Sequence, residues 1–143
     1  MKISRSDGQS LVEFALVIPI FVFMFIAFID LGRAIYTYAE LSNAVREGTR
    51  YAIVNPTCMV GAENAIIDVI HHYAINLNPA DMSIIFTPTL TPPCPDNPDN
   101  IVKISITYIY HPITPGLQLL VGPANAITFE AHSSALVAPL YQR

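Results

Sequence analysis

Residues 14–29 read FALVIPIFVFMFIAFI, sixteen consecutive residues without a charge, and the rest of the chain is interpreted outward from this stretch. Hydrophobic residues make up 52% of the 143 residues and charged residues only 13%, against about 25% charged residues in an ordinary soluble domain. The length allows one domain. The apolar excess excludes a disordered tail, and the net charge of −4 argues against a nucleic-acid partner.

The apolar stretch is close to the length of a membrane span. A helix needs about 20 apolar residues to cross a hydrocarbon core of about 30 Å. The stretch reaches this length only when Leu11 and Val12 are added, and the addition includes the carboxylate of Glu13.

A secretory signal peptide is the competing interpretation, because Lys2 and Arg5 supply a basic start. The best cleavage site, Gly-Arg-Ala at residues 32–34, places an arginine beside the cut. A helical repeat of apolar residues also continues past this site. We therefore predict no cleavage at residues 32–34 and one continuous helix from about Ser10 to about Val54, roughly 65 Å long.

The two halves of this helix differ. The first half is apolar all round, and Pro19 is expected to kink it. The second half is amphipathic, and Asn55-Pro56 ends it. Its predicted apolar stripe consists of Leu31, Ala34, Ile35, Tyr38, Leu41, Val45 and Ala52, and its polar face of Arg33, Glu40, Asn43, Glu47 and Arg50.

A shorter amphipathic helix is predicted from Ala62 to about Leu77, before Asn78-Pro79. Its buried stripe would contain Ala62, Ala65, Ile66, Val69, Ile70, Tyr73 and Leu77. Three strands are predicted after it, at Met82–Thr87, Ile101–His111 and Ile127–Val137, the last two with clear apolar and polar alternation. The fold class is therefore α+β: a long helix whose second half packs on an antiparallel sheet of about three strands.

Orientation does not follow from charge, because basic residues flank the apolar stretch on both sides. The folded region lies after the stretch and contains both cysteines, Cys58 and Cys94. One disulfide between them would require an oxidising compartment, which places the N-terminus inside and the C-terminal region outside. Two unpaired thiols are the alternative, and the spacings of zinc sites are absent.

Candidate catalytic residues are few. His71 and His72 are adjacent on a helix and cannot chelate one ion together, while His111, His132 and Glu130 are a weak combination on the outer face of the sheet. The sequence contains no nucleophile elbow, phosphate-binding loop or zinc-protease motif. We therefore expect no enzyme, no cofactor and no metal site.

The segment Gly8-Gln9-Ser10-Leu11-Val12-Glu13-Phe14 resembles the processing signal of type IV prepilins, in which a short basic leader ends in glycine and a glutamate is the fifth residue of the mature chain. The longer pattern GQSLVEFALVIPIF, DLGRAIY and AVREGTRYA is similar to the TadE-like pseudopilins of the tight-adherence (Flp-type) pilus system, over roughly residues 8–54. Gln9 departs from the commonest pilins, in which phenylalanine is frequent at this position.

This resemblance implies three parts: a leader, residues 1–8; a transmembrane and assembly helix, residues 9–30; and an extracytoplasmic domain, residues 31–143. A prepilin peptidase would cut between Gly8 and Gln9, and Glu13 would pair with the new amine, its own or a neighbour's, and fix the register of assembly. Asp30 and Arg33 would mark the point where the helix leaves the bilayer. Glu13 at the edge of an ordinary span is the plainer alternative.

The function implied is that of a minor pseudopilin in the cytoplasmic (inner) membrane, a single-pass protein that enters or primes a pilus. Its partners would be other pilin or pseudopilin subunits, bound through the N-terminal helix, together with the prepilin peptidase, the inner-membrane assembly platform and the lipid bilayer. The alternative is an uncleaved single-pass envelope protein whose sheet domain is an adhesin or binding module.

Overall fold

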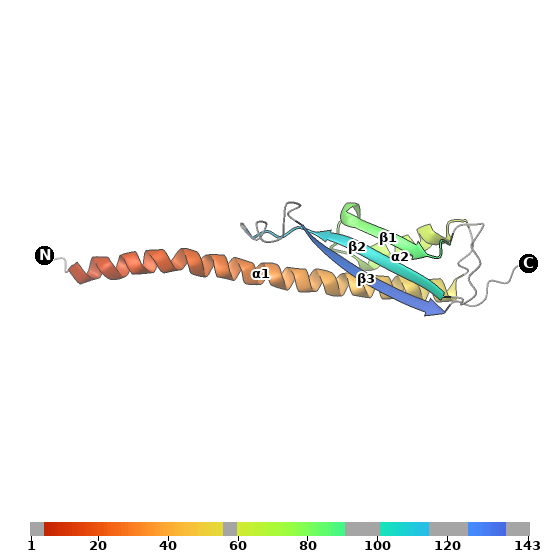
Figure 1. Ribbon diagram of the computed structural model, residues 1–143, viewed down its shortest axis with the longest axis horizontal. Helices are drawn as coiled ribbons and strands as arrows, with labels where there is room; N and C mark the ends of the chain where they lie inside the picture. The colour runs from red at the N-terminus through yellow and green to blue at the C-terminus, as the bar shows by residue number, and fades with distance from the viewer. Residues whose placement is uncertain (1–4, 56–59, 91–100, 115–125, 137–143) are drawn as a thin grey trace, which may run out of the picture.

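The computed structural model describes residues 5–55, 60–90, 101–114 and 126–136 (Figure 1). The chain forms two helices, a short 3₁₀ turn and three strands: α1 (Arg5–Val54), α2 (Ala62–Tyr73), the turn η1 (Pro79–Asp81), β1 (Met82–Thr87), β2 (Ile101–Tyr110) and β3 (Ile127–Leu136). The predicted α+β fold, a long helix packed on a three-stranded sheet, is confirmed.

Helix α1 contains 50 residues and is therefore about 75 Å long. Its N-terminal half projects beyond the rest of the molecule, whereas its C-terminal half lies against α2, β2 and β3 (Figure 1). The helix continues through Pro19 with a gradual curve rather than a break. It is long and apolar enough to cross a membrane.

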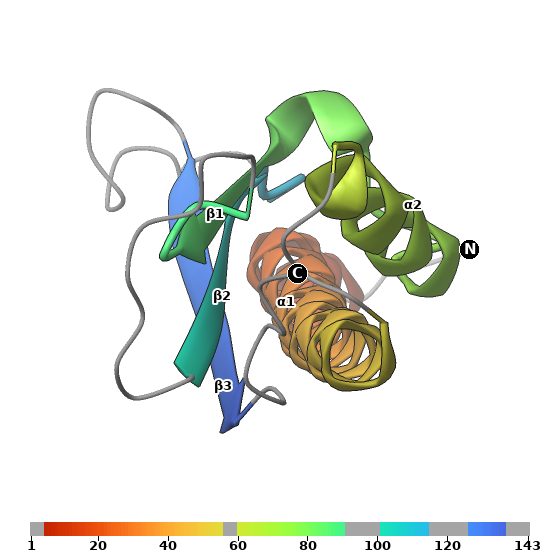
Figure 2. The same ribbon diagram turned by 90° about the vertical axis from the view of Figure 1, so that its right-hand side faces the viewer.

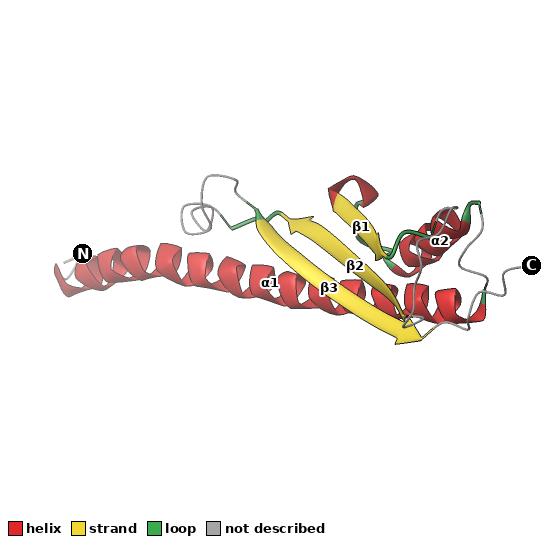
Figure 3. Cartoon of the chain, turned by 45° about the vertical axis from the view of Figure 1, so that its right-hand side comes forward, coloured by secondary structure: helices red, strands yellow, loops and turns green. Residues whose placement is uncertain are grey.

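The sheet has the strand order β1-β2-β3 and is antiparallel throughout, with Met82 opposite Tyr108 and Ser105 opposite His132. Helices α1 and α2 both lie on one face of it, as the end-on view shows (Figure 2). The predicted alternation is confirmed, because Val102, Ile104 and Ile106 are buried beneath the helices. We call α2, the sheet and residues 111–114 after β2 the head, and the end of it formed by residues 111–114 its base; the second half of α1 packs against the head (Figure 3).

Helices α1 and α2 pack closely against each other at Gly48. A Cβ atom at Gly48 would lie 2.6 Å from Cγ1 and 2.9 Å from Cδ1 of Ile70 on α2, well inside van der Waals contact. Since Ile70 is fully buried, a side chain at Gly48 would have little room. The absence of a side chain at this position sets the separation of the two helices.

The predicted buried stripe of α1 is wrong in its first two turns. Leu41, Val45 and Ala52 are buried as predicted. Three other members of the stripe are largely exposed instead, Leu31, Ile35 and Tyr38, and the residues buried in that region are Asp30 and Thr37. The polar side of the helix, not its most apolar side, meets the sheet there.

Helix α2 ends four residues earlier than predicted, at Tyr73 rather than Leu77. The chain leaves the helix because the backbone N–H of Asn76 donates to a carboxylate oxygen of Glu40 on α1, at 3.0 Å. Ala74 and Leu77 are buried in the resulting turn, whereas Tyr73, predicted to be buried, is 42% exposed.

Candidate functional site

The predicted processing residues lie in the first turns of α1. Gly8, Gln9 and Glu13 are all exposed, and a side chain at Gly8 would contact nothing within 4 Å. The side-chain amide of Gln9 donates to Glu13 across one helical turn, at 3.5 Å. Among the described residues, no hydrogen bond joins these three side chains to the head.

The residues between this end and the head are apolar and exposed. From Phe14 to Ile29, every large apolar side chain except Ile26 is among the exposed ones, with Phe14 at 65% and Phe28 at 64%. In water this surface would be unfavourable at about 25 cal/mol per Å². It therefore requires lipid or apolar protein around it.

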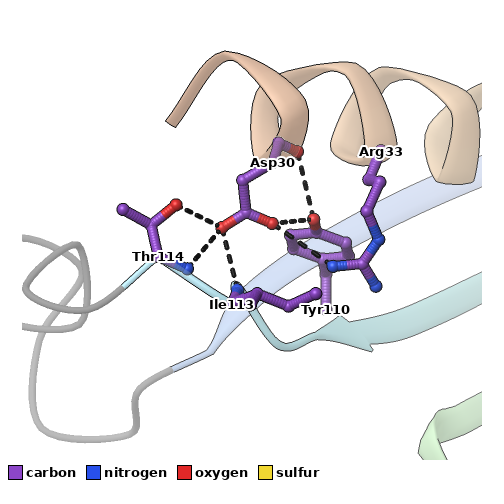
Figure 4. A network of polar contacts seen from close by, with 5 residues as sticks. All are labelled: Asp30, Arg33, Tyr110, Ile113 and Thr114. Carbon is purple, nitrogen blue, oxygen red and sulfur yellow. Dashed lines mark hydrogen bonds and ion pairs between the residues drawn. The ribbon is translucent and has the colours of Figure 1, made fainter. Parts of the chain in front are cut away.

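The end of the apolar stretch carries a second site, centred on Asp30. Only 3% of Asp30 is exposed, and its carboxylate is surrounded by donors from the chain that follows β2 (Figure 4). Its Oδ2 accepts from the backbone N–H of Ile113 at 2.8 Å, the N–H of Thr114 at 3.0 Å and the Thr114 hydroxyl at 2.9 Å. Its Oδ1 lies 2.6 Å from the hydroxyl of Tyr110.

These contacts make the buried carboxylate tolerable. An unpaired charge in a low-dielectric site costs several kcal/mol, whereas each hydrogen bond to a charged group contributes about 1.5–3 kcal/mol. Arg33, one turn away on α1, adds a 3.4 Å ion pair with Oδ1, and its guanidinium lies 5.7 Å from the centre of the Tyr110 ring. Through these hydrogen bonds, Asp30 connects α1 to the end of β2 and to the residues that follow β2.

The hydroxyl of Tyr110 is held in its neutral form. Burial away from water, the hydrogen bond to Asp30 and the negative charge of Asp30 raise the pKa of Tyr110 to about 12, against the opposing effect of Arg33. A neutral hydroxyl is required there because only a protonated Tyr110 donates to the carboxylate. The contact therefore persists at all physiological pH values.

The weak histidine candidates do not converge. His132 lies opposite Ser105 in the sheet, whereas His111 follows the end of β2, six residues or about 20 Å further along that strand. Among the described residues, no three metal-binding side chains come together. The cysteines of the predicted disulfide, Cys58 and Cys94, lie outside the described residues.

The site centred on Asp30 could be predicted only in part from the sequence. The position of Asp30 directly after the apolar stretch suggested a boundary, and in the structure Asp30 forms an ion pair with Arg33, three residues further along the helix. Its main partners, Tyr110 and Thr114, lie 80 and 84 residues further along the chain. Nothing in the local pattern identifies them.

Comparison with known proteins yields one match. No curated protein and no solved structure matches the chain. The family described as TadE-like protein matches residues 8–50, which include the exposed N-terminal turns, the apolar stretch, Asp30 and Gly48. This is a match to part of the chain, and it is to the family that the sequence resemblance predicted.

Proposed function

We propose that this protein is a minor pseudopilin of a tight-adherence pilus system, a structural component that is cut by a prepilin peptidase and assembles through the N-terminal half of α1. Its partners would be other pilus subunits and the inner-membrane assembly platform. It would reside in the cytoplasmic membrane, with the N-terminus inside and the head outside. The proposal gives the protein no catalytic role.

One observation carries the proposal: the apolar half of α1 is held away from the head. The stretch from Phe14 to Ile29 is exposed except at Ile26 and Ala27, which are half-buried, and the described hydrogen bonds between α1 and the head begin at Asp30. A lipid bilayer can cover this surface before assembly. Neighbouring helices of the same kind can cover it afterwards, since both environments remove apolar area from water.

Glu13 supports the assembly role. It stands at the edge of the apolar half, and among the contacts of the described residues it has the long one from Gln9. A carboxylate carried into an apolar bundle needs a cation, because an unpaired charge there is strongly unfavourable. Cleavage between Gly8 and Gln9 would create an amine one turn from Glu13, on its own chain or a neighbour's, and would so select one axial register.

The presence of the head supports the role of a minor subunit rather than the bulk filament protein. Sequence resemblance implies that the bulk Flp-type pilins are little more than the helix, whereas this chain adds α2 and three strands to it. The outer face of the sheet is largely polar and carries Lys103, Glu130 and His132. It is available for contacts with other envelope components.

Mass spectrometry of the N-terminus of the protein purified from native membranes tests the proposal. A mature chain beginning at Gln9 is expected, and a chain beginning at Met1 would favour the uncleaved adhesin or binding module. Gly8→Leu should abolish processing and leave the head folded, because Gly8 contacts nothing in the head. Gly32→Leu is the matched control, since Gly32 is equally unobstructed on the same helix and lies outside the signal.

Glu13→Gln tests assembly separately from processing and insertion. The variant keeps the size and hydrogen-bonding atoms of the side chain but removes its charge, so we expect normal cleavage and membrane insertion with loss of incorporation into pilus complexes. Co-purification with other pilus subunits measures this. Unchanged incorporation of Glu13→Gln would show that charge pairing at this position does not guide assembly.

A further inference from the structure

We infer that the lipid-facing surface of this protein does not end at Asp30, but continues along α1 to Ile35 and includes Ile113 at the base of the head. The base of the head would thus rest in the outer boundary of the bilayer, which is the partner of this surface. The inference concerns the subunit before assembly and rests on the membrane anchoring in the proposed function.

The length of the apolar stretch is the first argument. Sixteen residues from Phe14 to Ile29 make a helix of about 24 Å, which is shorter than a hydrocarbon core of about 30 Å. The 22 residues from Phe14 to Ile35 make about 33 Å, which is enough. The span placed in this way begins and ends five residues after the segment 9–30 expected from sequence.

The exposed apolar side of α1 continues across this extension, because Leu31 and Ile35 lie one turn apart on it, whereas the exposed Arg33 lies on the opposite side of the helix. Leu31 is 56% exposed and Ile35 is 62% exposed, similar to Phe28 and Ile29 within the apolar stretch. Tyr36 follows at 59% exposure, and tyrosines are enriched where a helix leaves the hydrocarbon for the headgroups.

The charges within the extension are the second argument. A carboxylate in a span is costly when it faces lipid, but Asp30 faces the head and accepts hydrogen bonds from Tyr110, Ile113 and Thr114. Arg33 is paired with Asp30, and its long side chain can extend toward the headgroups. Extension in the other direction would instead take in Glu13, which is exposed.

Ile113 extends this apolar surface from α1 onto the base of the head. Its N–H is bonded to Asp30, which fixes it beside the helix at the level of Asp30, and yet its side chain is 64% exposed. The preceding residue, Pro112, and the following residue, Thr114, are buried. An exposed isoleucine held at the end of a membrane-spanning stretch is continuous with the lipid-facing side of that stretch. The exposed His111 in the same turn would lie at headgroup level.

Single tryptophan substitutions test the inference, because the chain contains no tryptophan. Ile35→Trp and Ile113→Trp report on the proposed surface, and Phe28→Trp on the apolar stretch. Val54→Trp is the matched control, since it is exposed on the same helix about 28 Å beyond Ile35. The full-length protein is reconstituted into phosphatidylcholine–phosphatidylglycerol vesicles with bromine on the acyl chains close to the headgroups.

We expect the bromolipids to quench Ile35→Trp and Ile113→Trp to an extent comparable with Phe28→Trp, and to leave Val54→Trp unaffected. Quenching of Phe28→Trp with either of the other two unquenched would overturn the inference and leave membrane anchoring intact. An unquenched Phe28→Trp would overturn both. Blue-shifted but unquenched emission at Ile35 or Ile113 would identify a second copy, not lipid, as the covering partner. Protease resistance of the head shows that each variant is folded.

Discussion

Replacement of Asp30 by alanine should release the base of the head from α1. The substitution removes the acceptor of the N–H groups of Ile113 and Thr114, and Thr114 is fully buried. The hydroxyl of Tyr110 retains an alternative acceptor, the backbone carbonyl of residue 30 at 3.1 Å. Three donors lose their acceptor, the two N–H groups and the hydroxyl of Thr114. Together with the lost charge-assisted contact, this loss corresponds to about 3–5 kcal/mol.

Asp30→Asn should cost much less, about 1–2 kcal/mol, because one amide oxygen can still accept from Ile113 and Thr114. Thermal unfolding in detergent, followed by circular dichroism, distinguishes the two variants. For a head of this size, Asp30→Ala should lower the midpoint by about 10–20 °C. Asp68→Ala, which removes an exposed carboxylate from α2, is the control and should change it little.

The result that would refute this reasoning is an Asp30→Ala variant no less stable than Asp30→Asn. Water or another acceptor would then satisfy the donors of Ile113 and Thr114. The carboxylate would mark the boundary of the apolar stretch without holding the head to it.

Three further predictions concern other residues of the chain. Gly48→Ala should lower the free energy of unfolding by about 1–2 kcal/mol, because an overpacking cost of about 1–3 kcal/mol is partly offset by the better helix propensity of alanine. In the same unfolding assay, the control Gly32→Ala should be neutral or stabilising. Equal effects of the two substitutions would exclude a close helix contact at Gly48. In an alkaline titration of tyrosinate absorbance, one of the seven tyrosines should ionise late, near pH 12, and Tyr110→Phe should remove that component. Since the pKa of Tyr110 is raised by folding, its contribution to stability is complete below about pH 10 and is lost as the pH rises toward 12; an unchanged titration curve in Tyr110→Phe would contradict this. If Cys58 and Cys94 form a disulfide, reductant should change the mobility of the protein on a denaturing gel, and labelling of both thiols without reductant would exclude the bond.

Much of the fold could be predicted from the sequence, because its elements have strong local signals. The end of α1 at Val54 follows from the proline after Asn55, and the bounds of β1 follow from its composition. The alternation in β2 and β3 identified which side of each strand is buried. Each of these features depends on residues close together in the chain.

The errors lie where distant residues decide the outcome. The sequence assigned Leu31 and Ile35 to the core because apolar residues usually face it, but beside a membrane span apolar side chains have a second apolar environment available. Burial of Asp30 depends on donors from beyond β2, and the early end of α2 depends on Glu40. In all of these places, a polar contact across the fold outweighs the local periodicity.

The continuous α1 helix also determines how force would pass through the molecule. It has no flexible joint between its exposed half and the head, so an axial pull on the exposed half reaches the head directly. Among the described contacts, those of Asp30 are the most N-terminal hydrogen bonds from α1 to the head. All of these hydrogen bonds have the carboxylate of Asp30 as acceptor, so an axial force would act on them at the same time. Extraction of the subunit from the bilayer would therefore move the helix and the head as a single rigid piece.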